Sequence, residues 1–309
     1  MLLVFRLLGM VLLRRCVFLL ALLPILALSM AANAAKPVIS QQVLVSIHPL
    51  ALLVKSAWPQ LTVASLVPAN QSPHDFSLKP SDLGKVHNAD AVVWLGGEFE
   101  PYLIKLMGRR SQQVDLSLLS PESIEHDEHD EHDEHDEHDE HDEHDEHENH
   151  DPHLWLQPDK IPAILKAVQM ELGLSTPTDF LVAYNDWLES SKKAFEKSRH
   201  IGFVSFHDAF HNWVEYFELT QLDVVTLNPE KPVGTRHVVE VREILASGKA
   251  SCLFVEPQFQ TRLLKKLIQG LDVQQVSIDP MASQYEINQG DFLGFYKSLS
   301  QQFTICLTP

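Results

Sequence analysis

Short apolar runs alternate with amphipathic stretches along most of this chain of 309 residues, and this rhythm limits its fold more than any other feature. The runs are rich in Val, Ile, Leu and Trp with little periodic polarity, as in strands buried on both faces of a parallel sheet. Strands are predicted at residues 43–47, 62–67, 91–95, 203–206, 224–227, 252–255 and 275–278. Helices are predicted at residues 50–58, 77–88, 101–108, 161–172, 179–199, 209–219, 236–247, 260–269 and 291–306. Strand and helix alternating at this spacing indicate βαβ units and an α/β fold.

The rhythm occurs in two parts of the chain, which we expect to form two α/β lobes with mostly parallel sheets at residues 35–158 and 201–309. Residues 159–200 are predicted to form a helical connection. Its second half, residues 179–199, contains no Gly or Pro and carries apolar residues on one side. At about 1.5 Å per residue this segment would make a helix of roughly 30 Å. We therefore expect one long, rigid helix to join the lobes.

Residues 1–34 have the features of a cleavable signal peptide. Arginines precede the apolar run at residues 17–28, and Ala32-Asn33-Ala34 follows it with small residues at both outer positions. A membrane anchor is the alternative, but the run is shorter than the about 20 apolar residues that a bilayer span needs. We expect cleavage near Ala34 and a periplasmic mature protein.

The acidity of the chain is concentrated in one segment. Residues 125–151 hold 17 of the 42 acidic residues and no Lys or Arg, so the rest of the chain is close to neutral although the net charge is −18. This distribution argues against nucleic acid or a membrane surface as a partner, because both favour a basic protein surface. No apolar residue lies between His126 and Asp151, and we expect this insert to be disordered without metal.

The insert repeats histidine at every third position. Its nine histidines are His126, His129, His132, His135, His138, His141, His144, His147 and His150. Imidazole suits zinc, copper and nickel, and the neighbouring carboxylates attract cations. A solvated tract without function is the alternative. Since the repeat is degenerate and mobile, we interpret it as an auxiliary collector of metal and not as one specific site.

A specific site needs ligands held by separate rigid elements, and four residues lie where such ligands are expected. His74 follows the strand at 62–67, His207 ends the run at 203–206, Asp279 ends the run at 275–278, and His153 comes just after the insert. In α/β proteins, ligands bind outside the carboxyl ends of strands. Each residue alone is more often a cap or a hydrogen-bonded side chain, but together they predict a metal site in the cleft between the lobes.

Two cysteines, Cys252 and Cys306, remain after removal of the signal peptide. In an oxidising compartment such a pair most simply forms one disulfide. Two buried free thiols are the alternative, and a metal site built on this pair is less favoured still.

Six segments resemble motifs of one protein family. They are Ser-Pro-His-Asp-Phe-Ser-Leu-Lys-Pro-Ser-Asp (72–82), Asn-Ala-Asp-Ala-Val-Val-Trp-Leu-Gly (88–96), Asp-Pro-His-Leu-Trp-Leu (151–156), Phe-His-Asp-Ala-Phe (206–210), Phe-Val-Glu-Pro-Gln-Phe (254–259) and Ile-Asp-Pro (278–280). In this order they resemble the zinc-binding proteins of ABC transporters, the ZnuA family, and the similarity covers essentially the whole mature chain. The resemblance implies two α/β lobes joined by a rigid helix with the metal in the cleft.

The resemblance also implies individual roles. Three histidine ligands of the family fall on His74, His153 and His207, and its disulfide falls on Cys252 and Cys306. Related manganese and iron binders commonly carry a carboxylate at the third position, so three imidazoles favour zinc. The implied function is capture of Zn²⁺ and its delivery to a membrane permease, and we expect a monomer.

One departure concerns the fourth ligand. Some members of the family carry a ligating Glu before the first histidine, where this chain has Pro73, which cannot ligate. The fourth position then belongs to Asp279, to water or to a histidine of the insert, and we favour Asp279 or water. His48 is a further histidine that could face the cleft, and a surface position is at least as consistent with its sequence.

Two other functions compete with transport. His207-Asp208-Ala209-Phe210-His211 approximates the H-E-x-x-H motif of zinc hydrolases, but Asp is one methylene shorter than the usual Glu base, and we expect no enzyme. A zinc buffer acting through the insert is the second rival. Deletion of the insert separates the rivals, because a buffer would lose nearly all its capacity whereas a transport receptor would retain one tight equivalent.

Overall fold

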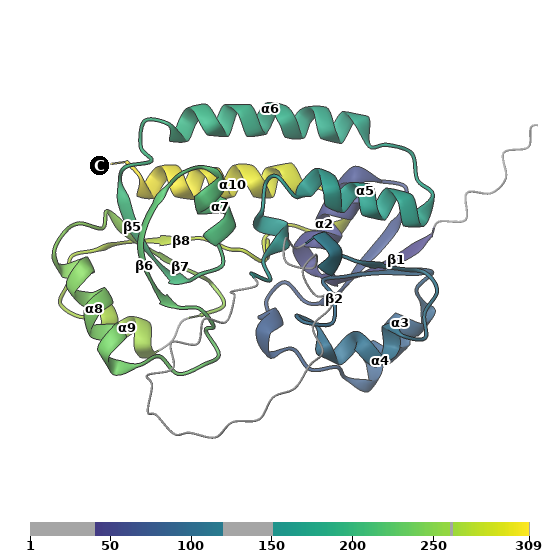
Figure 1. Ribbon diagram of the computed structural model, residues 1–309, viewed down its shortest axis with the longest axis horizontal. Coiled ribbons are helices and arrows are strands. Elements are labelled where there is room, and N and C mark those ends of the chain that lie inside the picture. Colours follow the sequence, from purple (N-terminus) through teal and green to yellow (C-terminus); the bar gives the residue numbers. More distant parts are fainter. Residues whose placement is uncertain (1–40, 120–150, 260–261, 309) are drawn as a thin grey trace, which may run out of the picture. The chain divides into compact units, whose positions relative to one another are not determined.

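The computed structural model of this chain describes residues 41–119, 151–259 and 262–308 (Figure 1). The predicted signal peptide, and the insert up to residue 150, lie outside the described residues, so the disorder predicted for the insert is not tested. In the described part of the chain, each helix is too short or too polar to cross a membrane.

The first half of the chain forms a parallel sheet of four strands. They are β1 (Gln42–Ile47), β2 (Thr62–Val67), β3 (Ala91–Trp94) and β4 (Gln113–Asp115). The order across the sheet is β2-β1-β3-β4, and every pairing is parallel. The sequence predicts the first three strands but not β4, because a single buried residue, Val114, gives too short an apolar signal.

The second half forms another parallel sheet of four strands. They are β5 (Gly202–His207), β6 (Thr220–Thr226), β7 (Cys252–Val255) and β8 (Gln274–Ser277). Their order is β6-β5-β7-β8, so the two sheets have the same topology, and the predicted α/β class is confirmed. β6 begins at Thr220, earlier than predicted. The prediction missed its first half because these residues are mostly polar and only half-buried.

Helices cover both sheets (Figure 1). They are α2 (His48–Ala57), α3 (Pro80–Asn88), α4 (Ile104–Met107), α5 (Ile161–Leu172), α6 (Thr178–Phe195), α7 (His211–Tyr216), α8 (Thr235–Ala246), α9 (Arg262–Ile268) and α10 (Phe292–Cys306). The 3₁₀ turns η1 (Pro73–Asp75) and η5 (Leu154–Leu156) complete the part of the fold that holds the site. The predicted helices are all present, and several are shorter than predicted.

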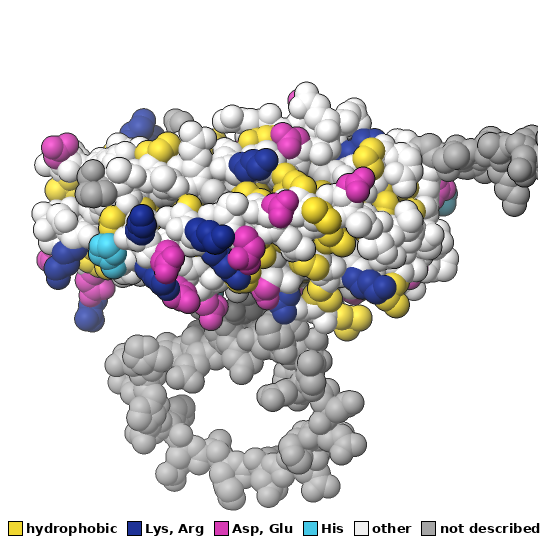
Figure 2. Space-filling view, turned by 90° about the horizontal axis from the view of Figure 1, so that it is seen from above, with side chains coloured by type: hydrophobic (Ala, Val, Ile, Leu, Met, Phe, Trp, Pro, Cys, Tyr) yellow, Lys and Arg dark blue, Asp and Glu magenta, His cyan; other side chains and the backbone are white. Residues whose placement is uncertain are grey.

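Helix α6 is the connection that the sequence predicts as a long helix. Its 18 residues make it about 27 Å long. Buried residues recur at helical spacing along one side, namely Phe180, Tyr184, Trp187, Ser191 and Phe195. Seen from above, the outer face carries basic and acidic side chains that are interspersed (Figure 2). The side with the buried residues therefore packs against the rest of the protein, whereas the opposite side of α6 is exposed to solvent.

One hydrophobic cluster contains residues of both sheets, from Val45 in β1 to Phe254 in β7. Helix α10 runs beside α6 and also contacts α2, so it touches elements on either side of the connection (Figure 1). Its buried Tyr296 donates a hydrogen bond to the carbonyl of Trp155 at 2.7 Å, and the Trp155 indole donates to the carbonyl of Pro280 at 2.8 Å. Two helices and a shared core, rather than one helix alone, thus hold the sheets together.

Cys252 and Cys306 form a disulfide whose Cα atoms are 5.5 Å apart. Cys252 is the first residue of β7 and Cys306 is the last of α10, and both are fully buried. The bond ties the end of α10 to the second sheet.

We predict that replacing both cysteines by Ala lowers the free energy of unfolding by about 2–5 kcal/mol, because the bond closes a loop between residues 54 positions apart. Urea unfolding measures this loss. A reductant should destabilise the unaltered chain to a similar extent and leave the double variant unchanged. An unaltered chain insensitive to reductant would contradict the prediction.

Candidate metal site

His74 is presented by the loop that leaves the carboxyl end of β2. It lies in η1, where Pro73 starts the turn and the hydroxyl of Ser72 accepts a hydrogen bond from the His74 backbone N–H at 3.3 Å. Its ring atom Nε2 is buried and has no hydrogen-bond partner among the described residues. The turn therefore directs an imidazole nitrogen inward, where it has no protein partner among the described residues and could bind a ligand.

His153 precedes η5 and is only 4% exposed. Its backbone N–H donates to Oδ1 of Asp151 at 2.9 Å, and its Nδ1 lies 2.6 Å from the same oxygen. Burial alone would raise the pKa of Asp151, but the His153 charge and its hydrogen bonds hold that pKa below the usual value. An ionised carboxylate can only accept, so in neutral His153 the proton sits on Nδ1 and Nε2 keeps a lone pair.

His207 is the last residue of β5 and is 3% exposed. Its Nδ1 lies 3.1 Å from Oε1 of Glu256, which directly follows β7 and is also buried. The parallel register pairs Ser205 with Phe254, so that two residues further along each chain segment His207 and Glu256 come side by side. Nε2 of His207 is buried without a partner among the described residues, as in His74.

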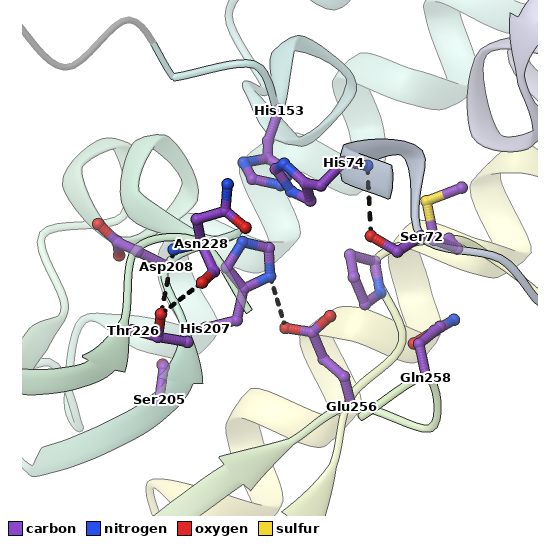
Figure 3. Close-up of polar contacts among 12 residues, drawn as sticks. Ser72, His74, His153, Ser205, His207, Asp208, Thr226, Asn228, Glu256 and Gln258 are labelled. Carbon is purple, nitrogen blue, oxygen red and sulfur yellow. Dashed lines mark hydrogen bonds and ion pairs between the residues drawn. The ribbon is translucent and has the colours of Figure 1, made fainter. Parts of the chain in front are cut away.

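The three imidazoles converge from three separate elements (Figure 3). One ring nitrogen from each of His74, His153 and His207 lies within 4.8 Å of the others. The ring centroids are 5.0–5.4 Å apart. The small cavity that they line, together with apolar groups such as Trp155 and Phe259, has a volume of about 10 Å³, which suits one small ion or water.

Electrostatics keep the first imidazole neutral. Burial, and then the nearness of His153 and His207, lower the pKa of His74 from 6.5 to about 3, although Asp151 opposes this. Neutral imidazole is the form that ligates metals. Three imidazoles that bind a metal as neutral ligands carry no charge, whereas Asp151 and Glu256, when ionised, place two negative charges behind them. A divalent cation at the centre would balance these two charges.

Asp279, predicted as a possible fourth ligand, is not part of this group in the described structure. Its Oδ1 accepts hydrogen bonds from the Gln258 amide at 2.7 Å and the Met281 N–H at 3.0 Å. Its Oδ2 accepts from the backbone N–H and the hydroxyl of Ser283, both at 2.6 Å. The carboxylate thus organises its own loop, and the geometry gives no support to direct ligation by Asp279.

Two other histidines considered from the sequence also lie outside the group. His48 begins α2, and its Nε2 lies 2.7 Å from the carbonyl oxygen of Tyr285. His211 is exposed, and its nearest acidic partner is Asp208 at 3.9 Å. The spacing of His207 and His211 therefore does not produce the paired ligands of an H-E-x-x-H helix. The nine insert histidines lie outside the described residues.

Sequence reasoning missed the roles of Asp151 and Glu256. Asp151 was assigned to the insert, although it stands two residues before His153 in the Asp-Pro-His motif. Glu256 comes directly after a buried strand, the same signal that identifies His207 and Asp279. A carboxylate at the end of one strand, beside a strand that ends in histidine, could therefore have been recognised as a hydrogen-bond partner for the imidazole.

Solved structures share this fold. A crystal structure of ZnuA matches with a TM-score of 0.69 at 20% identity, covering 87% of this chain and 100% of that one. The periplasmic zinc-binding protein TroA from Treponema pallidum matches with a TM-score of 0.67 at 16% identity, again over 87% of this chain and 100% of that one. The arrangement of two sheets is thus the fold of these two proteins.

Sequence comparison identifies the family. Residues 43–306 match the model of ZnuA, described as zinc-uptake complex component A, periplasmic. The high-affinity zinc uptake system protein ZnuA of Yersinia pestis is 30% identical over 87% of this chain and 92% of its own length. The protein of the same name from Haemophilus ducreyi is 32% identical over 91% and 98%. The chain belongs to the ZnuA family.

The depressed pKa of His74 predicts how the stability of the metal-free protein depends on pH. Between about 3 and 6.5 the unfolded chain binds a proton at His74 that the folded chain does not, so stability should fall as pH decreases through this range. One such group contributes a slope of up to about 1.4 kcal/mol per pH unit. In urea unfolding, His74→Gln should lose this contribution, whereas His87→Gln on an exposed position should retain it. Equal slopes for the two variants would refute the assignment.

Glu256 should control the affinity of the site without touching the metal. We predict that Glu256→Gln weakens zinc binding by about tenfold, because it removes the negative charge that polarises His207. Competition with a chelator measures this change. Glu215→Gln, an exposed position on α7, serves as the control and should bind like the unaltered chain.

Proposed function

We propose that this protein captures zinc in the periplasm at His74, His153 and His207 and delivers the ion to the membrane permease of an ABC transporter. The observation that carries the proposal is the convergence of three imidazole nitrogens within 4.8 Å of one another from three different segments. Structural and catalytic zinc sites use three or four such ligands in tetrahedral geometry.

The donor set supports zinc over the hard cations. Imidazole nitrogen suits zinc, copper and nickel, whereas magnesium, calcium and manganese prefer oxygen ligands. Membership of a zinc-uptake family and the names of the Yersinia and Haemophilus relatives favour zinc within that group. We infer that the fourth position holds water.

Each part of the chain would have a role in this function. Residues 35–158 and 201–309 would act as two lobes around the site, with residues 159–200 as the connection and cleavage of the leader near Ala34. The insert at residues 125–151 would gather zinc weakly through its nine histidines and raise the local concentration beside the site. The protein would act as a monomer.

Release of the ion would depend on the permease. Helices α6 and α10, with a hydrophobic cluster that contains residues of both sheets, leave the receptor little freedom to open by itself. Docking on the permease, or an energised rearrangement of it, would then have to pull the three imidazoles apart.

The two rival functions have less support. A buffer acting through the insert would need no folded site, yet the described residues form one without any insert histidine. A hydrolase using His207 and His211 would need both on one face of a helix, but His207 ends β5 and His211 is exposed. Transport remains the function that uses the buried triad.

The test uses a chain that lacks residues 125–150 and retains Asp151. We expect it to bind one zinc ion tightly and to support growth of a zinc-starved strain that lacks its own receptor. Ala substitution at His74, His153 or His207 should each lower affinity by at least about 100-fold, because each removes one of the few zinc ligands. Chelator competition and metal analysis measure affinity and stoichiometry.

His87→Ala and His237→Ala are matched controls, because His87 is exposed and His237 bonds to the Val224 carbonyl at 2.7 Å. Both should bind like the parent. If the shortened chain bound no zinc, the folded site would be wrong and the buffer would be favoured. Metal-dependent ester or peptide hydrolysis abolished by His207→Ala would favour the hydrolase.

A further inference from the structure

Gln258 lines the same cavity as the three histidines. It lies two residues beyond Glu256, in the loop after β7. Its carbonyl oxygen Oε1 is buried and has no hydrogen-bond partner among the described residues. A buried acceptor of this kind costs free energy unless a donor reaches it.

The orientation of the Gln258 amide is determined by its surroundings. Its nitrogen donates to Oδ1 of Asp279 at 2.7 Å and approaches the carbonyl oxygen of Ala69 at 3.5 Å. Both are acceptors, so rotating the amide by half a turn would place oxygen against oxygen. Figure 3 shows the amide nitrogen directed away from the three histidines. The oxygen is therefore left on the side of the cavity.

Asp279 is itself held rigidly. The Met281 N–H and both donors of Ser283 bind its two oxygens. Asp279, one candidate for the fourth ligand, thus binds the amide nitrogen of Gln258 and leaves the amide oxygen toward the cavity.

Three atoms on the wall of this cavity are buried without a partner among the described residues: Nε2 of His74, Nε2 of His207 and Oε1 of Gln258. The nitrogens are ligands for a cation. The amide oxygen is a poor zinc ligand beside three imidazoles but a good acceptor for a polarised O–H group, since zinc makes its bound water acidic.

We propose that Gln258 Oε1 accepts a hydrogen bond from the water that completes the coordination of zinc, with Asp279 orienting the amide. This inference rests on the proposed function and names the residue that holds the fourth ligand. Gln258 is a positioning residue, and this arrangement replaces the direct carboxylate ligand that Pro73 rules out and Asp279 does not supply.

The experiment uses the chain without residues 125–150, loaded with Zn²⁺ or Co²⁺. Gln258→Leu removes the acceptor, and we expect zinc affinity to fall by about tenfold. The Co²⁺ absorption spectrum should change with ionisation of the bound water at a lower pH than in the parent, because a lost acceptor no longer favours the protonated water. Gln274→Leu, an exposed position on β8, is the control and should alter neither reading.

Asp279→Asn separates positioning from ligation. If Asp279 only orients the amide, its loss should weaken binding less than Gln258→Leu does. A larger loss for Asp279→Asn would overturn the proposal in favour of direct ligation by Asp279. Parent-like affinity and an unchanged pH transition in Gln258→Leu would also overturn it.

A measurement on the chain with its cleft unaltered keeps the proposal testable if Gln258→Leu does not fold. Electron–nuclear double resonance of the Co²⁺ form in H₂O and D₂O should reveal exchangeable protons on a ligand oxygen. Their absence would exclude a bound water and overturn the proposal. A parent chain that binds no zinc at all would instead refute the proposed function, so the two failures are distinguishable.

Discussion

The hydrophobic cluster shared by the two sheets is the feature on which the candidate site depends. His74 lies in η1, in the loop after β2 of the first sheet, and His207 ends β5 of the second sheet, so the distance between their rings depends on how the two sheets pack together. Helices α6 and α10 pack side by side, and the Tyr296–Trp155–Pro280 chain of hydrogen bonds links α10, the segment after His153 and the loop after β8. A metal site of separate ligands requires this rigidity, because each ligand must hold its place before the ion arrives.

Behind the imidazoles stands a layer of groups that would not touch the ion. Asp151 and Glu256 hold Nδ1 of His153 and His207, and Asp279 holds the amide of Gln258. The histidines would supply the lone pairs that bind the ion, and the carboxylates behind them would supply the negative charge that balances it. This division explains why acidic residues lie close to the site although none of the described ones belongs to the ligand group.

Much of the fold follows from local pattern. Strongly apolar runs predicted seven of the eight strands in the described residues, because strands buried on both faces are rich in aliphatic residues. The helical spacing of apolar residues predicted the connection α6. The pattern failed where burial is partial. β4 buries only Val114, and the start of β6 is polar, so neither has the composition of a buried strand. Helix α6 ends at Phe195, its last buried residue, four residues before the predicted end at 199.

The amino-acid sequence is enough to predict the class of fold and to recognise the acidic histidine repeat, the cysteine pair and the three candidate histidine ligands. Those features are local or compositional, and each residue type limits its own chemistry. The packing of distant segments, which the sequence does not reveal, brings His74, His153 and His207 together and leaves His48, His211 and Asp279 outside the group. The tertiary structure also shows that Asp151, assigned to the insert, bonds to His153. The physical reason is that a side chain becomes a ligand or a support according to the donors and acceptors that distant segments bring beside it.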